Sequence, residues 1–495
     1  MFVKRTKIVC TLGPSSESVD ILLKMVKAGM NVARLNFSHG TYDNHQMLIK
    51  NIRAVEQKTG EPIAVMQDLQ GPKIRVGIMP ADGLALKAGE MITFDTAAAD
   101  HSRGVIPVDY SDLHLYLKKG ERLLLDDGRI ETKIVRVVNT QISAEVIVGG
   151  VLTSHKGINA PDSKLVVRAL TDKDKEDVRF GVANGVDLVA LSFVTKPEDI
   201  LDLRYLIKEY EKELNLKPAQ PIRIVAKIER YEAVQNIKLI LEAADGIMIA
   251  RGDLGIEIPA QEVPLVQKRL VDLALDAAKP VIVATQMLDS MQKNPRPTRA
   301  EVSDVANAVI DHTDAVMLSN ETAAGQYPVE TVETMSDIIL ETEKSVYDNL
   351  PLRQAPATPA GRQGKPFSSV HGKHKKIDDI ISQMSRALAE EVGAKLILAA
   401  SISGETARLI SRYRPELPIV VATATDRVKH QMNLSWGVVP FLLEPCRTIE
   451  ELVERSLVEL KKRQMVKVVD KIIVVAGEPV GHAGHVNLLE VREVL

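Results

Sequence analysis

The chain has 495 residues, of which 45% are hydrophobic and 26% charged, and its formal net charge at neutral pH is -3. At about 150 residues per domain, this length predicts roughly three domains. The balanced charge gives no overall attraction to nucleic acid or to an anionic membrane, so we expect neither as a partner. Any site for a polyanion must therefore be local.

Cysteine usage and the N-terminal segment bear on the cellular compartment. Two cysteines occur, Cys10 and Cys446, without a neighbouring Cys or His at metal-ligand spacing, which argues against a disulfide framework and a zinc site. The first apolar run stops at Gly13 and Pro14, too early for a signal peptide or a membrane span. We therefore expect a cytoplasmic protein.

Short β-branched segments alternate with helical stretches, the pattern of repeated βα units around a parallel sheet. Eight segments are predicted as strands: KIVCTL from Lys7, NVARLNF from Asn31, IAVMQDL from Ile63, VDLVALSF from Val186, RIVAKIE from Arg223, GIMIARGD from Gly246, VIVATQM from Val281 and DAVMLSNE from Asp314. They predict a (β/α)8 TIM barrel over residues 1–70 and 167–347, with the active site at the carboxyl ends of the strands.

Two further domains follow from the spacing of these segments. Residues 71–166 separate the third and fourth strands, and their strand-like runs between Gly, Asp and Asn turns predict an inserted small β-barrel or sandwich that acts as a lid. Residues 348–376 carry Pro, Gly and basic residues and predict a linker. Residues 377–495 alternate helical and strand patterns again and predict an open α/β domain.

Polar side chains follow the carboxyl ends of several predicted strands. They are Arg34, Asn36, Ser38 and His39 at the second strand, Asp68, Lys73 and Arg75 at the third, Lys227 and Glu229 at the fifth, Gly252 and Asp253 at the sixth, and Thr285 at the seventh. Singly, each is more often a surface residue, a structural ion pair or a helix cap than a ligand. Their joint occurrence on consecutive strand ends predicts a shared site.

The residue types at these strand ends suit phosphoryl transfer. Glu229 and Asp253 can hold a hard divalent cation while leaving positions open to substrate oxygens and water. The cationic side chains can bind phosphate oxygens, Arg in a bidentate manner and Lys as a compact charge. Phosphoryl transfer needs mainly positioning and charge neutralisation, which such a cluster supplies.

At these residues the sequence resembles pyruvate kinases, and the resemblance covers nearly the whole chain. The segments that carry it, in family order, are TKIVCTLGPSS, MNVARLNFSHG, LQGPKIRVG, LDDGRI, KGIN, AKIER, IMIARGDLGIEI, VIVATQML and NETAAGQYPVE. The resemblance implies a barrel with a mobile β lid and a C-terminal regulatory domain, usually as a homotetramer. It also implies the glycolytic reaction in which phosphoenolpyruvate and ADP give pyruvate and ATP.

The resemblance further implies roles for single residues at the phosphate. Glu229 and Asp253 would be the ligands of Mg2+, for which Mn2+ can substitute. Lys227 would neutralise the transferring phosphoryl group and the developing enolate oxygen, and Arg34 would bind the phosphate.

Other roles concern the remaining parts of the substrates. The backbone of Gly252 and the hydroxyl of Thr285 would meet the pyruvate carboxylate, with Thr285 also near the path of the proton that quenches the enolate. The positions that match nucleotide contacts, or border that pocket, are Arg75, Lys156, Asn36 and His39.

The family's better-known members bind potassium through residues matching Asn36, Ser38 and Asp68 and the carbonyl at Leu69. Those members carry Glu where this chain has Lys73, and Lys at that position resembles the branch that works without potassium. An ammonium group close to Asp68 can replace a bound monovalent cation electrostatically. We therefore expect turnover without added potassium; the alternative is that Lys73 points to solvent and the cation site remains.

In the C-terminal region, a loop of small polar residues follows the segment KLILAAS and opens a helix: Ser401, Ser403, Gly404 and Thr406. Its hydroxyls and amides can cradle a phosphate, although such residues are also ordinary helix caps. Resemblance to the family's effector loop favours an allosteric site for a sugar phosphate or a nucleotide monophosphate.

Two other functions fit parts of this pattern. A carbon–carbon lyase or aldolase barrel would also bind phosphoenolpyruvate or a keto acid through magnesium, but it has no need of the lid with Arg75 and Lys156. A catalytically silent phosphometabolite-binding protein would keep the fold for regulation, but it has no need of an intact set of catalytic residues, here Lys227, Glu229, Asp253 and Thr285.

Overall fold

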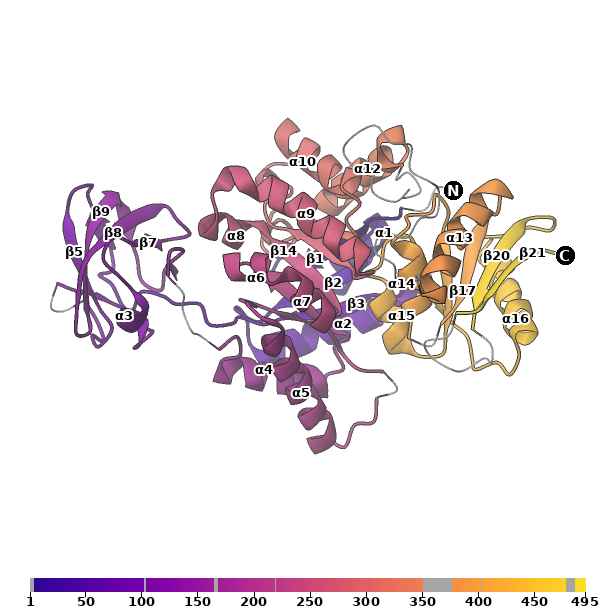
Figure 1. Cartoon of the computed structure of the whole chain (residues 1–495), viewed down its shortest axis with the longest axis horizontal. Helices are drawn as coiled ribbons and strands as arrows, with labels where there is room; N and C mark the ends of the chain where they lie inside the picture. Colours follow the sequence, from indigo (N-terminus) through magenta and orange to yellow (C-terminus); the bar gives the residue numbers. More distant parts are fainter. Residues whose placement is uncertain are drawn as a thin grey trace.

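The computed structural model describes residues 4–101, 104–163, 168–218, 220–349, 376–401, 403–477 and 486–495. Its three parts lie in a row, with the inserted β domain at one end of the central barrel and the C-terminal domain at the other (Figure 1). The expected linker, residues 348–376, lies outside the described residues except for its first two residues and its last.

Eight parallel strands close the central barrel in the order β1-β16-β15-β14-β13-β12-β3-β2. They are β1 (Lys7–Thr11), β2 (Val32–Asn36), β3 (Ala64–Asp68), β12 (Leu188–Leu191), β13 (Arg223–Ile228), β14 (Gly246–Ala250), β15 (Val281–Ala284) and β16 (Ala315–Leu318). Each falls within one of the expected segments, so the (β/α)8 architecture is confirmed. Their residues are almost all buried because barrel side chains fill the inside and helices cover the outside.

Helices surround this barrel. They are α1 (Val19–Ala28), α2 (Tyr42–Thr59), α4 (Asp172–Ala183), α5 (Pro197–Glu213), α6 (Tyr231–Gln235), α7 (Ile237–Ala243), α8 (Arg251–Glu257), α9 (Val263–Asp276), α10 (Arg299–Ile310), α11 (Asn320–Ala323) and α12 (Pro328–Glu343), with 3-10 turns η1 (Ala260–Glu262), η2 (Asp289–Gln292) and η3 (Val346–Asp348). Threonine capping boxes fix the starts of three of them, at Thr41, Thr171 and Thr298.

The sixth expected strand, GIMIARGD, is shorter than its sequence suggested. The strand ends at Ala250, and α8 begins at Arg251, so Gly252 and Asp253 lie in the first turn of a helix. The cause is Arg251, whose guanidinium donates to the carbonyl oxygen of Thr285 at 2.7 Å and to Asp304 at 2.7 and 2.8 Å. These bonds hold the start of α8 against the carboxyl end of β15.

The inserted domain is built of short strands, as expected, around its own apolar core. A six-stranded sheet has the order β11-β7-β8-β9-β5-β6, and β10 pairs with β4 in a second, two-stranded sheet. The strands are β4 (Leu84–Leu86), β5 (Met91–Asp95), β6 (Ile106–Pro107), β7 (Arg122–Leu125), β8 (Ile130–Val138), β9 (Gln141–Val148), β10 (Gly150–Leu152) and β11 (Ile158–Asn159), with one short helix, α3 (Leu113–Tyr116). The described strands form two sheets and not a single closed ring.

The C-terminal domain is an open α/β sheet in the order β19-β18-β17-β20-β21, which confirms the expected class. Four strands are parallel and β21 is antiparallel at the edge. The elements are α13 (Ile377–Glu391), β17 (Leu396–Ala400), α14 (Glu405–Ser411), β18 (Ile419–Thr423), α15 (Asp426–Met432), β19 (Val438–Leu442), α16 (Ile449–Lys462), β20 (Lys471–Ala476) and β21 (Leu488–Glu493).

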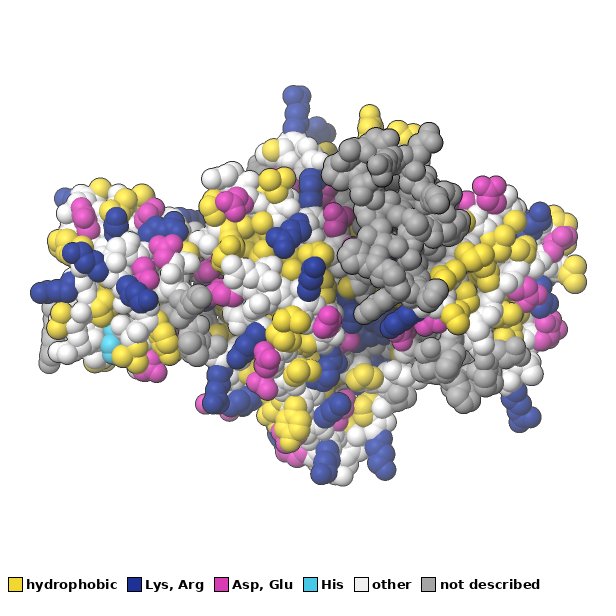
Figure 2. Space-filling view, in the orientation of Figure 1, with side chains coloured by type: hydrophobic (Ala, Val, Ile, Leu, Met, Phe, Trp, Pro, Cys, Tyr) yellow, Lys and Arg dark blue, Asp and Glu magenta, His cyan; other side chains and the backbone are white. Residues whose placement is uncertain are grey.

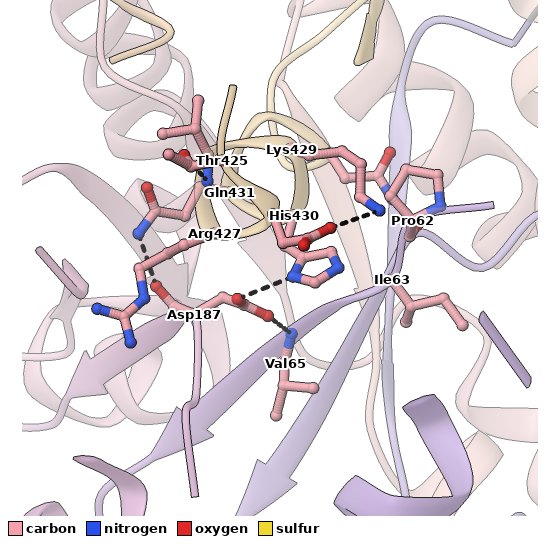
Figure 3. A network of polar contacts seen from close by, with 12 residues as sticks. Pro62, Ile63, Val65, Asp187, Thr425, Arg427, Lys429, His430 and Gln431 are labelled. Atoms are coloured by element: carbon pink, nitrogen blue, oxygen red, sulfur yellow. Dashed lines mark hydrogen bonds and ion pairs between the residues drawn. The ribbon is translucent and has the colours of Figure 1, made fainter. Parts of the chain in front are cut away.

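The C-terminal domain packs on the barrel floor, where the amino ends of the strands lie. His430 of α15 bridges two carboxylates there, with Nδ1 3.1 Å from Asp187 and Nε2 2.6 Å from Glu56. Asp187 also accepts a bond from the Val65 amide, so this contact reaches the barrel strand β3 (Figure 3). The mouth of the barrel, at the opposite ends of the strands, faces the inserted domain (Figure 1).

Positive and negative side chains are interspersed on the face drawn in Figure 2. This matches the small net charge of the whole sequence. Among the described residues, we find no helix with both the length and the apolar character needed to cross a bilayer.

Candidate active site

A compact set of ion pairs lies at the barrel mouth around Lys227, the fifth residue of β13. Its Nζ lies 2.9 Å from Glu229 and 3.2 Å from Asp68, and it donates to the Ser192 hydroxyl at 2.7 Å. Burial alone would lower the pKa of Lys227, but the two carboxylates outweigh it and raise the pKa above its ordinary value. The lysine is therefore held as a cation.

Asp68 ends β3 and joins a second cation to this cluster. Its other carboxylate oxygen accepts from Arg34 Nε at 2.6 Å, while Arg34 Nη1 donates to the Thr11 hydroxyl at 2.9 Å. Burial would raise the pKa of Asp68, but Arg34 and Lys227 together bring it below the usual value. One buried carboxylate thus positions two cationic side chains that come from different strands.

Glu229 follows β13 directly and is 2% exposed. One of its oxygens accepts from the Phe193 amide at 2.6 Å, and the other pairs with Lys227. Burial raises the pKa of Glu229, and the negative charge of Asp253 raises it further against the opposing effect of Lys227. The charge of Asp253 therefore acts on Glu229.

Thr285 adopts a strained backbone conformation at the end of β15. Its φ is +70°, a left-handed value that is a true outlier for a β-branched residue. Two contacts hold it: Arg251 binds its carbonyl oxygen, and its hydroxyl accepts from the Gly252 amide at 2.8 Å. Such strain persists only where the surroundings impose it, and it commonly marks functional sites.

The structure brings together most of the residues expected at the strand ends. Arg34, Asp68, Lys227 and Glu229 form one ion-pair network, and Gly252 and Thr285 are hydrogen-bonded to each other. Asp253 joins the network through its charge, which acts on both Lys227 and Glu229.

Sequence reasoning missed three partners of this network: Ser192, Thr11 and the Phe193 amide. Ser192 follows the fourth strand, so the strand-end rule would have found it had it been applied there. Thr11 is the last residue of β1, and the same rule covers it. A backbone amide leaves no sequence signal.

Three expected ligands lie on or beside the inserted domain. Arg75 Nη1 donates to the carbonyl oxygen of His155 at 2.9 Å, and Lys156 pairs with Asp126 at 2.7 Å. Lys73 pairs with Asp127 at 3.3 Å. Across the described residues, these side chains make ion pairs and hydrogen bonds within the insertion and the segment leading into it, and not with the Lys227 network.

The residues at and after the end of β2 make local hydrogen bonds. Asn36 accepts from the Ser38 amide at 3.1 Å, and both residues are partly buried. His39 is exposed, and its carbonyl oxygen accepts from His45 Nε2 at 3.0 Å. Only Asp68, of the four expected monovalent-cation residues, is found in the ion-pair network of the mouth.

The expected effector loop lies between β17 and α14. Ser401 and Ser403 are partly buried, Thr406 is 7% exposed, and Gly404 has φ +76°. A Cβ at Gly404 would lie 2.2 Å from Met432 Sδ, so packing alone already requires glycine there. The loop contacts the barrel floor, because Arg223 donates to the carbonyl oxygen of Ser403.

Family models match both large parts of the chain. Residues 3–332 match a model described as pyruvate kinase, barrel domain, and residues 379–492 match pyruvate kinase, alpha/beta domain. The two matches follow the barrel and the open sheet described above.

Whole-chain comparisons agree. The chain is 42% identical to a pyruvate kinase of Geobacillus stearothermophilus, over 99% of this chain and 80% of the relative. It is 39% identical to a pyruvate kinase of Mycobacterium tuberculosis strain H37Rv, over 99% and 98%. A crystal structure of a pyruvate kinase from Cryptosporidium parvum superimposes with a TM-score of 0.87 at 33% identity, over 99% and 96% of the two chains. The chain belongs to the pyruvate kinase family.

Proposed function

We propose that the Lys227 network is the centre at which this chain transfers the phosphoryl group of phosphoenolpyruvate to ADP. The observation that carries the proposal is the shared carboxylate of Asp68, which holds Lys227 and Arg34 at 3.2 and 2.6 Å. Two fixed cations at one point neutralise the charge of a phosphoryl group without reorganisation during the reaction.

Glu229 and Asp253 fit a divalent cation. Burial and the negative charge of Asp253 raise the pKa of Glu229, and a cation bound by the two carboxylates would relieve that cost. Within the described part of the chain no three carboxylate, His or Cys side chains form a metal-binding group. The remaining ligands would then be substrate and water oxygens, as is usual for Mg2+, with Mn2+ as a substitute. When bound, the ion supplies Lewis-acid stabilisation of phosphoryl and enolate oxygens.

Gly252 and Thr285 would receive the carboxylate of the substrate. The Thr285 hydroxyl accepts from the Gly252 amide at 2.8 Å and donates to the Ala284 carbonyl oxygen at 2.6 Å. Once that hydroxyl rotates, both groups would donate to the substrate at one place. Breaking the bond between phosphorus and the enol oxygen leaves an enolate, with Lys227 neutralising its charge. Proton delivery to the enolate carbon then completes pyruvate, and the strained position of Thr285 suits this path.

The inserted domain would bring the nucleotide to the mouth. Arg75 and Lys156 lie near each other there, because Arg75 pairs in an isolated bridge with Gly157. A small cavity of about 30 Å³ lies at this junction, lined by Lys73 and Asn159 of the insertion and by Phe193 and Glu257 of the barrel, and Asn159 donates to Glu257 at 3.4 Å beside it. Domain movement at this junction would carry the two cations toward the phosphate, with Asn36 and His39 bordering the same approach.

A coupled assay tests the assignment. Pyruvate formation should depend on phosphoenolpyruvate, ADP and Mg2+, and Lys227→Met should lower kcat by at least about 10²-fold, as for removal of one preorganised charge. Pyruvate released without ADP would favour a lyase, and binding of phosphoenolpyruvate without turnover would favour a silent binding protein. Retention of kcat in Lys227→Met would contradict the role of Lys227.

We also propose that turnover does not require potassium. Asp68, the carboxylate expected to bind the ion, already has two cationic partners in Arg34 and Lys227. Lys73 adds a third positive charge to the segment that follows it, although its ion pair is with Asp127. Such a site has little residual negative charge to attract a monovalent cation.

The remaining assignments are proposals drawn from the family. The domain limits are 1–70 with 167–347, 71–166 and 377–495, joined by the linker at 348–376. The assembly would be a homotetramer activated by a phosphorylated metabolite at Ser401, Ser403, Gly404 and Thr406. Support for regulation comes from the bond between Arg223 and Ser403, which links this loop to the strand that carries Lys227.

Two free cysteines fit a reducing compartment such as the cytoplasm.

A further inference from the structure

Cationic side chains gather where α14 of the C-terminal domain meets the barrel floor. Arg223 is the first residue of β13, Lys279 lies two residues before β15, and Arg408 lies within α14. These three side chains interact electrostatically with one another; Arg223 is 8% exposed, and Lys279 and Arg408 are partly buried. None of them is part of the proposed catalytic network.

This floor cluster, defined as Arg223, Lys279 and Arg408, has too little negative charge around it. In the described part of the chain none of the three has a carboxylate within ion-pair distance; Arg223 and Lys279 donate only to carbonyl oxygens, those of Ser403 and Ala244. Two carboxylates act on the cluster from further away. They are Asp245, which pairs with Arg204 at 2.9 Å, and Glu405, which is exposed.

Burial with too little negative charge nearby lowers the proton affinity of the floor cluster. Burial lowers the pKa of Arg223 well below its ordinary value, and it also lowers the pKa values of Lys279 and Arg408. A buried cation without a counterion is costly, and proteins normally provide a partner for it. An external anion would meet this need.

A narrow cavity opens beside the cluster. It has a volume of about 10 Å³, enough for one water-sized occupant. Its polar lining consists of Lys279, Arg408, Ser411, Arg412, Arg414, Ser435 and Asp314.

Several donors at this cavity have no partner among the described residues. Ser435 is 1% exposed, and its hydroxyl makes no hydrogen bond. Arg408 Nη1 and Arg412 Nε are also buried atoms without a hydrogen-bond partner. The one carboxylate in the lining, Asp314, is already used: it accepts from Arg414 at 3.1 Å and from the Trp436 amide at 3.0 Å. The unused groups at the cavity are therefore mainly donors.

We propose that this cavity is a binding site for a small inorganic anion, which neutralises Arg408 and Lys279 and joins α14 to the barrel floor. In the conformation described the cavity holds one water-sized occupant, so chloride would require it to widen slightly and phosphate would require it to widen more. The site is separate from the expected phosphate loop, because none of the residues of that loop lines the cavity: Ser401, Ser403, Gly404 and Thr406. It does not depend on the proposed catalytic roles.

An anion titration of the full chain tests this site. Sodium chloride, or sodium phosphate in a second arm, replaces sodium gluconate at constant ionic strength, and the midpoint of thermal unfolding is recorded. Trp436, the single tryptophan of the sequence, is 1% exposed and has the Arg414 guanidinium 5.0 Å from its ring centroid, so its fluorescence reports on the same place. We expect a saturable rise in the midpoint and a saturable fluorescence change; the arm that saturates at the lower concentration identifies the anion.

Arg408→Gln is the variant of choice, because it removes the unpaired charge. It should bind the anion about 10-fold to 100-fold more weakly, as for loss of a charge-assisted hydrogen bond. In gluconate alone it should be at least as stable as the unchanged protein, because no counterion is lost. The matched control is Arg427→Gln, an arginine of the same interface that donates to the Gln220 carbonyl oxygen at 2.8 Å; it should keep the anion response.

Two results would overturn the proposal. One is a response to chloride and to phosphate that does not saturate or that is equal in Arg408→Gln and in the unchanged protein. The other is a crystal soaked in bromide whose anomalous density is absent from this cavity. If Arg408→Gln does not fold, Lys279→Met with the same titration takes its place and is expected to show the same weakening.

Discussion

The strand β13 has a buried cation at each end, and the two ends differ in how the positive charge is balanced. At the mouth, Lys227 lies between Asp68 and Glu229 at 3.2 and 2.9 Å. At the floor, Arg223 donates to a carbonyl oxygen and has no carboxylate within ion-pair distance in the described part of the chain. Carboxylates of the chain itself balance the positive charge at the mouth, whereas the positive charge at the floor remains available to bind an anion.

This difference separates two uses of buried charge. The mouth carboxylates position the cations and leave their open sides for a substrate, so the site is ready before the substrate arrives. The floor cations are placed by two different domains, and an anion between them would strengthen the contact between those domains. Removing charge should therefore have opposite effects on stability at the two ends.

The largest expected effect is at Asp68. Asp68→Asn leaves Lys227 and Arg34 with one negative charge fewer, and breaking a buried ion pair in this way costs about 3–5 kcal/mol of unfolding free energy. Urea denaturation followed by circular dichroism measures the change. Arg408→Gln at the floor, measured in gluconate buffer, should show no such loss.

Ser192→Ala is the control for Asp68→Asn. It removes a neutral partner of Lys227 and should cost about 2 kcal/mol, because the hydrogen bonds from Lys227 and to the Leu69 carbonyl oxygen are lost while the charges remain balanced. A loss at Asp68→Asn no larger than that at Ser192→Ala would show that charge balance is not what stabilises the mouth.

An intermediate effect is expected at His430, a titratable side chain of the floor that has two carboxylate partners. Burial would lower its pKa, but the hydrogen bonds to Asp187 and Glu56 raise it above the ordinary value. Because the folded pKa is the higher one, this stabilisation is complete below about pH 6.5, the unfolded value, and is lost as pH rises through the folded pKa. His430→Gln should remove that part of the pH dependence; a tenfold difference in proton affinity between the folded and unfolded states corresponds to about 1.4 kcal/mol.

Thermal midpoints measured from pH 6 to about pH 9 check the effect of His430. The charged groups that face the imidazole are Asp187, Glu56, Arg53 and Lys429. Lys429→Gln changes a neighbouring charge and keeps the titrating group, so it should preserve the slope. An unchanged slope in His430→Gln would assign the pH dependence to other groups.

The smallest expected effect concerns Lys73, next to the mouth. The chain should turn over in buffers whose only monovalent cation is tetramethylammonium, because the carboxylate Asp68 is already paired. Lys73→Glu reverses the charge on the segment that follows Asp68 and should create a requirement for potassium, seen as an activity ratio of about tenfold, or 1.4 kcal/mol, with and without the ion. Lys73→Gln, which removes charge without reversing it, serves as the control; loss of activity of the unchanged protein without potassium would contradict this proposal.

The strand-end rule predicted the mouth well because barrel geometry makes it general. Carboxyl ends of all parallel strands meet on one face, so Arg34, Asp68, Lys227 and Glu229 had to lie near each other once eight strands were assigned. The rule did not predict that Asp68 would serve both cations. The shared role of Asp68 depends on the directions of its side chain and of its partners. These directions follow from the stagger between neighbouring strands, and the alternation of residue types along one strand does not reveal that stagger.

Other features had no local signal. The helical start at Arg251 arises from contacts with Thr285 and Asp304, which are more than thirty residues away in sequence. The partners of Lys73 and Arg75 depend on how the inserted domain packs, and the sequence predicted a lid without its contacts.

By itself, the sequence determined the eight barrel strands, the inserted β domain, the open C-terminal sheet and the inventory of charged groups at the mouth. Periodicity and turn residues are local properties, and they determine which segments become strands. Only the tertiary structure decided which charges are neutralised: Lys227 by two carboxylates, Arg408 by none among the described residues. Coulomb interactions act between groups that are distant in sequence, so their balance exists only once the chain has folded.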